Sequence, residues 1–63
     1  NAYELLMTAP ESQVTRCRVA LKAVMAGDWK EATFYLRNAA EDGSNWAKEA
    51  LQLADKYEAL AKE

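Results

Sequence analysis

Apolar residues recur every three to four positions along three long segments of the chain, which is the spacing of one face of an α-helix. No stretch alternates apolar and polar residues as a half-buried strand would. Alanine, leucine, lysine and glutamate, all good helix formers, are abundant, and there is a single proline. The pattern predicts an all-α protein with helices over residues 9–26, 29–41 and 45–62.

The breaks between these segments carry the residues that start and stop helices. Thr8 precedes Glu11 by three positions, so the two predict a capping box, with Pro10 tolerated in the first helical turn. Gly27 predicts a left-handed cap at the end of the first long helix, and Asp28 predicts the cap of the next, in a second capping box with Glu31. At the second break Gly43 is the expected C-cap, followed by an N-cap at position 44 or 45.

Short breaks fold consecutive helices back on each other, so we expect a three-helix bundle of antiparallel hairpins. The 63 residues leave room for one domain, residues 1–63. Residues 2–7 have two alternatives. A short helix capped by Asn1 would place Tyr3, Leu6 and Met7 against the bundle, and an extended arm would reach a second subunit.

A chain this short usually needs a disulfide, a structural metal or self-association to fold stably. Cys17 is the only cysteine and histidine is absent, which excludes an intrachain disulfide and a four-ligand zinc site. Self-association as a homodimer is the remaining expectation. The third predicted helix carries apolar residues spaced four, three, four and three, as in a coiled coil, and two aromatic residues of the second helix face away from the first. The expected dimer or partner interface is Trp46, Ala50, Leu53, Tyr57, Leu60, Phe34 and Tyr35.

The net charge of −2 argues against a strongly basic nucleic-acid binder. The basic residues are concentrated before position 41, and the remainder of the chain is net acidic. An alternative function is therefore a DNA-binding regulator like a helix-turn-helix protein, in which the second helix reads DNA through Lys30, Thr33, Arg37 and Asn38. The candidate nucleic-acid contacts are Arg16, Arg18, Lys22, Lys30 and Arg37.

The residues for catalysis are missing from this sequence. There is no histidine, no nucleophile paired with a base and no set of metal ligands, so we expect no enzyme activity, catalytic site, metal or cofactor. Cys17 lies on an apolar stripe and is expected to be a buried, unreactive thiol. The chain has no apolar run long enough to cross a membrane and no signal peptide, and one cysteine favours a reducing compartment, so we expect a cytoplasmic protein. The start at Asn1 leaves open whether residues precede it.

Residues 20–40 resemble one tetratricopeptide hairpin. The small residues and the turn of that repeat fall on Ala20, Gly27, Asp28, Trp29, Glu31, Ala32, Leu36 and Ala39. The resemblance implies two helices packed closely through alanines and a third helix that covers them. Two departures weaken a peptide-binding role. Only one repeat is present, and the surface that would bind a peptide carries Cys17, Leu21 and Val24 in place of polar and basic residues.

The chain as a whole, read from NAYELLMTAPESQVTRCRVALKAVMAGDWKEATFYLRNAAEDG onward, resembles the small accessory proteins that lambdoid bacteriophages encode between their exonuclease and excisionase genes. That resemblance implies a helical early-lytic protein in the cytoplasm of the infected bacterium that engages host or phage proteins. It implies no catalytic residues. The hypothesis for function is therefore a small non-catalytic protein–protein interaction module, a homodimer with an unidentified host or phage partner.

Overall fold

The computed structural model describes residues 2–41 and 45–63, which are all-helical apart from short connections. In chain order the elements are α1 (Ala2–Thr8), a single 3₁₀ turn η1 (Glu11–Gln13), α2 (Val14–Met25), α3 (Trp29–Ala39) and α4 (Asn45–Ala61). The expected all-α bundle is confirmed. Of the two alternatives for residues 2–7, the short helix is present as α1, so four helices pack together.

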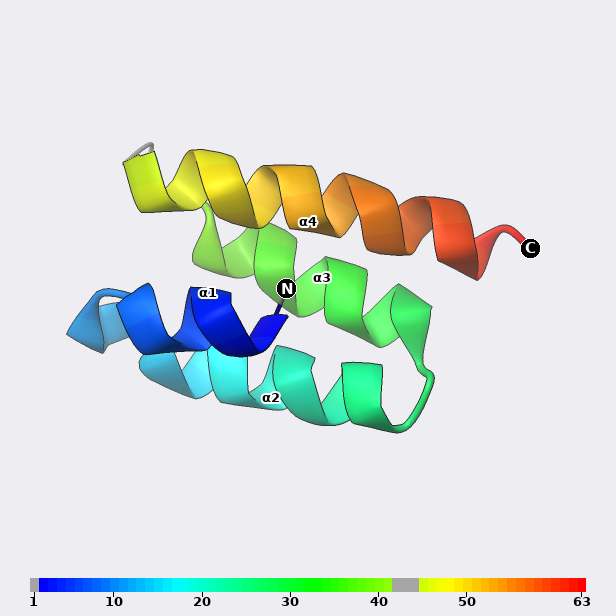
Figure 1. Ribbon diagram of the computed structural model, residues 1–63, viewed down its shortest axis with the longest axis horizontal. Helices are drawn as coiled ribbons and strands as arrows, with labels where there is room; N and C mark the ends of the chain where they lie inside the picture. Colours follow the sequence, from blue (N-terminus) through cyan, green and yellow to red (C-terminus); the bar gives the residue numbers. More distant parts are fainter. Residues whose placement is uncertain (1, 42–44) are drawn as a thin grey trace.

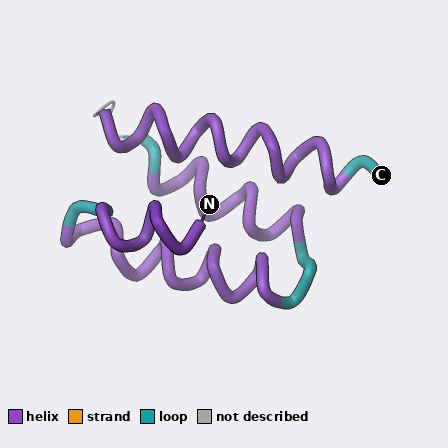
Figure 2. Tube along the Cα trace, in the orientation of Figure 1, coloured by secondary structure: helices purple, strands orange, loops and turns teal. Residues whose placement is uncertain are grey.

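The three longer helices lie side by side, with α3 between α2 and α4 (Figure 1). Consecutive helices run in opposite directions, as the short breaks predicted, and Figure 2 shows how short the connections are. Helix α1 lies over one face of this layer and contacts α2 and α4. Because α1 covers only one face, the opposite face of α3 is left open to solvent.

The first long helix does not begin as the sequence predicted. Thr8 is the last residue of α1, and its hydroxyl donates hydrogen bonds to the carbonyls of Glu4 and Leu5, so it caps nothing downstream. Pro10 adopts an extended conformation with ψ 148° and precedes η1, and it disfavours a helical conformation at Ala9. The predicted capping box of Thr8 with Glu11 is therefore wrong, and regular α-helix starts only at Val14.

The junction of α2 and α3 follows the prediction closely. Gly27 has φ +75°, the left-handed conformation expected of a C-cap. The Asp28 carboxylate accepts a hydrogen bond from the Glu31 amide and caps α3. The Asp28 amide donates to the carbonyl of Ala23, which completes the end of α2. This amide is therefore not available to the Glu31 side chain, and only the Asp28 half of the predicted capping box forms. The predicted joint at Gly43 and Ser44 lies outside the described residues.

Small side chains make up most of the core. Ala20 of α2 and Ala32 and Ala39 of α3 are fully buried, and Leu36 is the largest side chain that is fully buried. Alanines let helix backbones approach closely, so a small protein can pack tightly with few large residues. The larger contributions come from Trp46 and Tyr57 of α4, which pack under α1 and at the α2–α3 corner.

Candidate interaction surface

The coiled-coil seam predicted on α4 is mostly buried within one chain. Trp46 donates its indole N–H to the carbonyl of Leu5 in α1 at 3.0 Å, and Tyr57 stacks on Trp29 with ring centroids 5.4 Å apart. Ala50 is fully buried. In this arrangement these residues are covered by other parts of the same chain and do not offer an exposed seam to a second subunit.

The two other members of that seam, Leu53 and Leu60, are half-buried and pack against the same core.

Burial raises the pKa of the Tyr57 hydroxyl, and a hydrogen bond with the backbone of Ala2 opposes that shift. Burial also raises the pKa of the Cys17 thiol, which is 2% exposed. A raised pKa lowers the fraction of reactive thiolate, so Cys17 has the environment of an unreactive core cysteine.

The candidate nucleic-acid contacts do not form a single free basic surface. Arg16, Arg18 and Lys22 are exposed on α2, and Arg16 donates to the side-chain oxygen of Gln13 at 2.9 Å. On α3, the proposed base-reading Thr33 is buried, and its hydroxyl donates to the carbonyl of Trp29 at 2.8 Å. The helix-turn-helix interpretation thus loses part of its reading surface.

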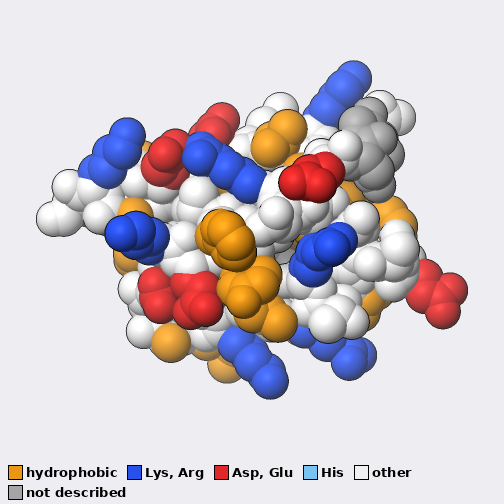
Figure 3. All heavy atoms as spheres, turned by 180° about the vertical axis from the view of Figure 1, so that it is seen from behind, with side chains coloured by type: hydrophobic (Ala, Val, Ile, Leu, Met, Phe, Trp, Pro, Cys, Tyr) orange, Lys and Arg blue, Asp and Glu red, His pale blue; other side chains and the backbone are white. Residues whose placement is uncertain are grey.

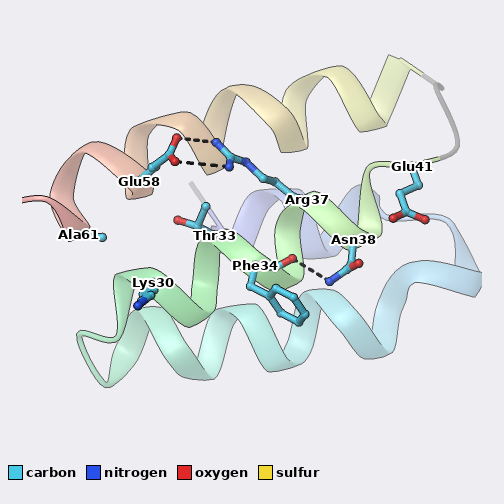
Figure 4. A pocket seen from close by; sticks show the side chains of 8 residues that line it. All are labelled: Lys30, Thr33, Phe34, Arg37, Asn38, Glu41, Glu58 and Ala61. Carbon is cyan, nitrogen blue, oxygen red and sulfur yellow. Dashed lines mark hydrogen bonds and ion pairs between the residues drawn. The ribbon is translucent and has the colours of Figure 1, made fainter.

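Arg37 is held between two carboxylates of α4. Its guanidinium forms an ion pair with Glu58 (Figure 4) and a second one, at 3.3 Å, with Asp55. The hydrogen bonds with Arg37 lower the pKa of the Glu58 carboxyl, and the same contacts raise the pKa of Arg37. Because its charge is already paired, Arg37 is a weak candidate for phosphate contact, but its position is well fixed.

The open face of the α2–α3–α4 layer carries an exposed aromatic ring. Phe34 is 61% exposed, and its ring meets the half-buried Tyr35 edge to face at 5.3 Å. Figure 3 shows apolar side chains gathered in the middle of this face with charged side chains around them. An open hollow of about 350 Å³ lies here along α3 and the end of α4. It is lined by Lys30, Thr33, Phe34, Arg37, Asn38, Glu41, Glu58 and Ala61.

Four residues of this face follow one another along α3 and the turn after it. Lys30 lies at one end of the hollow and Glu41 at the other, while Arg37 points toward α4 and Phe34 points the opposite way (Figure 4). The sequence prediction had assigned Phe34 to a partner interface and the two basic residues to DNA. It does not join these three residues into one surface, although their spacing of four and three positions places them on one stripe of a helix.

Other exposed apolar side chains lie on separate parts of the molecule. Tyr3 and Met7 are exposed on α1, Met25 lies at the end of α2, and Leu51 is 42% exposed on α4. A second hollow between α1 and α4 is lined by Glu4, Leu5, Thr8, Glu49, Gln52 and Leu53. It is more polar than the first and contains no exposed aromatic ring, so the Phe34 face is the better candidate for contact with another protein.

Residues 2–41 and 45–63 contain no group of three or more acidic or cysteine side chains arranged to hold a metal ion. None of the described helices combines the length and the apolar character needed to span a bilayer. Comparison with protein-family models, curated proteins and solved structures found no match.

Proposed function

We propose that this protein is a non-catalytic protein–protein interaction module whose contact surface is the open face of the α2–α3–α4 layer. One observation supports this proposal: Phe34 is exposed beside a hollow on the open face of the layer, on the side of α3 opposite α1. A large aromatic ring held in water on a rigid helix is costly to leave exposed and contributes strongly when a partner covers it.

The surface is suited to recognition because it combines an apolar centre with fixed polar groups. Arg37 is oriented by Glu58 and Asp55, and Asn38 donates to the carbonyl of Phe34 at 3.0 Å. Charged groups of both signs surround the ring, as in the polar rim of a protein interface. Such a rim selects among partners more than it adds affinity.

The test replaces the aromatic ring and follows partner binding in the native cell. Phe34→Ser should abolish co-purification of the proteins that the tagged wild-type chain retains, while its helical circular dichroism stays unchanged because the ring is on the surface. Met25→Ser is the matched control, since Met25 is 79% exposed but lies at the end of α2. Equal capture by both variants and the wild type would exclude this face as the contact surface.

A DNA-binding regulator is the alternative from a different class, and the geometry favours it less. Thr33 is buried and Arg37 is paired, which leaves Arg16, Arg18 and Lys22 of α2 as the exposed cations of the proposed set together with Lys30. A DNA-binding protein should shift a duplex at low salt and release it steeply as salt rises. The wild-type chain is expected to show no such shift.

The resemblance to lambdoid phage accessory proteins fits this proposal, since it implies a helical protein that acts by engaging host or phage proteins in the bacterial cytoplasm. It is tested by the identity of the captured partner. Recovery of a bacterial or phage regulatory protein by the wild-type chain, and its loss with Phe34→Ser, would support both the biological setting and the surface.

A further inference from the structure

We propose that the chain covering Phe34 is a second copy of this protein, with the two α3 helices packed antiparallel through their open faces. This inference rests on the proposed interaction surface and names its occupant. The argument comes from the order of charges along α3, because that order is complementary to itself in one orientation only.

The open stripe consists of Lys30, Phe34 and Arg37 on α3 together with Glu41, which lies two residues after the helix ends; all four side chains are exposed and line the same hollow. The steps of four and three residues keep the three helical members within about 60° of one another around the helix, at about 100° per residue. This is the spacing at which two helices pack side by side as a coiled coil. The stripe thus contributes four residues from each chain to the contact.

When two identical helices pack antiparallel, residue numbers rise along one helix as they fall along the other, so the numbers of two facing residues add up to the same value. For this stripe the register that places all four residues in contact has a sum of 71. Lys30 then faces Glu41 of the partner subunit, and Phe34 faces Arg37 of the partner subunit. The two-fold axis repeats each pair, so one register gives two ion pairs and two contacts between an aromatic ring and a cation. No residue of the stripe is left opposite a like charge.

The parallel arrangement would place each residue against its own copy. Lysine would then meet lysine, arginine would meet arginine and glutamate would meet glutamate, so three of the four layers would repel. The charge pattern therefore selects the antiparallel orientation, as charged positions do in coiled coils generally.

Two features of the single chain prepare this contact. Arg37 is fixed by Glu58 and Asp55 while 43% of its side chain is exposed, so little freedom is lost when the ring of a second chain packs against it. Lys30 lies in the first turn of α3 and Glu41 just beyond its end, where the helix dipole disfavours each charge. Among the described residues neither forms an ion pair within the chain, and the dimer supplies each with an opposite charge.

The first test exchanges the charges and measures mass by sedimentation or light scattering across a dilution series. Lys30→Glu and Glu41→Lys should each weaken the dimer about tenfold, because each places two like-charge pairs in the contact. The double variant, with both exchanges in one chain, restores opposite charges and should return the dissociation constant close to that of the wild type. Lys56→Glu, an exposed charge on another face of α4, should change it little.

The second test fixes the orientation by disulfide formation between two variants. An equimolar mixture of Lys30→Cys and Glu41→Cys proteins should form a mixed disulfide on mild oxidation, and neither variant alone should cross-link efficiently. The native Cys17 is buried and should not contribute. Cross-linking of Lys30→Cys to itself in preference to the mixture would indicate a parallel pair and overturn the proposed register.

The outcomes separate this inference from the proposed function. A wild-type chain that stays monomeric at millimolar concentration, or a dimer that neither charge reversal weakens, overturns the α3 pairing. If Phe34→Ser still abolishes capture of a different protein in that case, the surface remains an interaction site with another occupant. Loss of the dimer on single exchange, with recovery in the double variant, supports the pairing directly.

Discussion

At the scale of single residues, the turn between α2 and α3 shows how two chemical requirements are met in adjacent positions. Gly27 supplies the left-handed backbone that ends α2, and Asp28 supplies the carboxylate that begins α3. The Asp28 amide bonds to Ala23 and the Gly27 amide to Val24, so the last carbonyls of α2 are also satisfied. The antiparallel hairpin follows from this local arrangement.

Gly27→Ala should lower the free energy of unfolding by about 1 to 2 kcal/mol, because an L-residue is strained at positive φ. A methyl group added at this position meets no atom within 4 Å, so the backbone conformation alone accounts for the loss. Gly27→Asn is the matched control and should lose less, since asparagine tolerates this conformation better. Urea unfolding followed by circular dichroism measures both. An equal loss in the two variants would contradict the backbone explanation.

The same kind of local signal failed at Thr8, and the reason is physical. The TAPE sequence fits a capping box as well as GDWKE does, but a capping residue must have a free side chain and a non-helical backbone. Thr8 has neither, because it belongs to α1 and bonds back to Glu4 and Leu5. Whether residues 2–7 are helical depends on the tertiary contact with Trp46, which no local pattern contains.

At the scale of elements, α3 and α4 are joined by the ion pairs of Arg37, and the Thr33 hydroxyl, which donates to Trp29, also lies 3.5 Å from the carbonyl of Ala54. The spacing of apolar residues predicted correctly that α4 has a wide apolar face. It could not show which partner covers that face, because intrachain and interchain burial require the same residue types. The sequence prediction assigned Trp46 and Tyr57 to a dimer, and the single chain buries them instead.

The Arg37 ion pairs should make stability depend on pH in a defined direction. Arg37 lowers the pKa of Glu58 in the folded state, so the contribution of this pair is fully present above the unfolded pKa of about 4.3. It is lost as the pH falls through the lowered folded-state value. The free energy of unfolding of the wild type should therefore exceed that of Glu58→Gln at pH 7, and the difference should shrink toward pH 3. Salt should also reduce it, since the pair is exposed.

Chemical unfolding at fixed protein concentration measures this difference, since concentration alters the stability of an oligomer. Glu49→Gln is the matched control, because Glu49 is exposed on a different face of α4. It should follow the wild-type pH dependence. A constant difference between wild type and Glu58→Gln from pH 7 to pH 3 would show that the carboxylate charge is not what stabilises this contact.

At the scale of the whole molecule, the sequence predicted the helical class and the tight α2–α3 hairpin, because each rests on local or compositional signals. The candidate surface was only partly predictable. Phe34 was assigned to an interface, but the exposure of its face depends on where α1 packs, and α1 is positioned by Trp46 and Tyr57. Long-range packing thus decides which apolar residues are core and which remain available for binding.

The bond from Trp46 to Leu5 therefore tests whether α1 belongs to one cooperative unit. Trp46→Phe keeps an aromatic ring but removes the indole donor and leaves the Leu5 carbonyl with the longer bond from the Thr8 hydroxyl, so the free energy of unfolding should fall by about 1 to 2 kcal/mol. Cys17, being buried, reports opening of the core through its rate of labelling by a thiol reagent. If the chain opens as one unit, labelling should accelerate about 5- to 30-fold, in step with the lost stability.

Gly27→Ala provides the control, because it weakens the fold far from α1. A labelling rate that rises much more in Trp46→Phe than in Gly27→Ala at equal loss of stability would mean that α1 detaches separately, exposing the covered face of the layer while the other three helices stay folded.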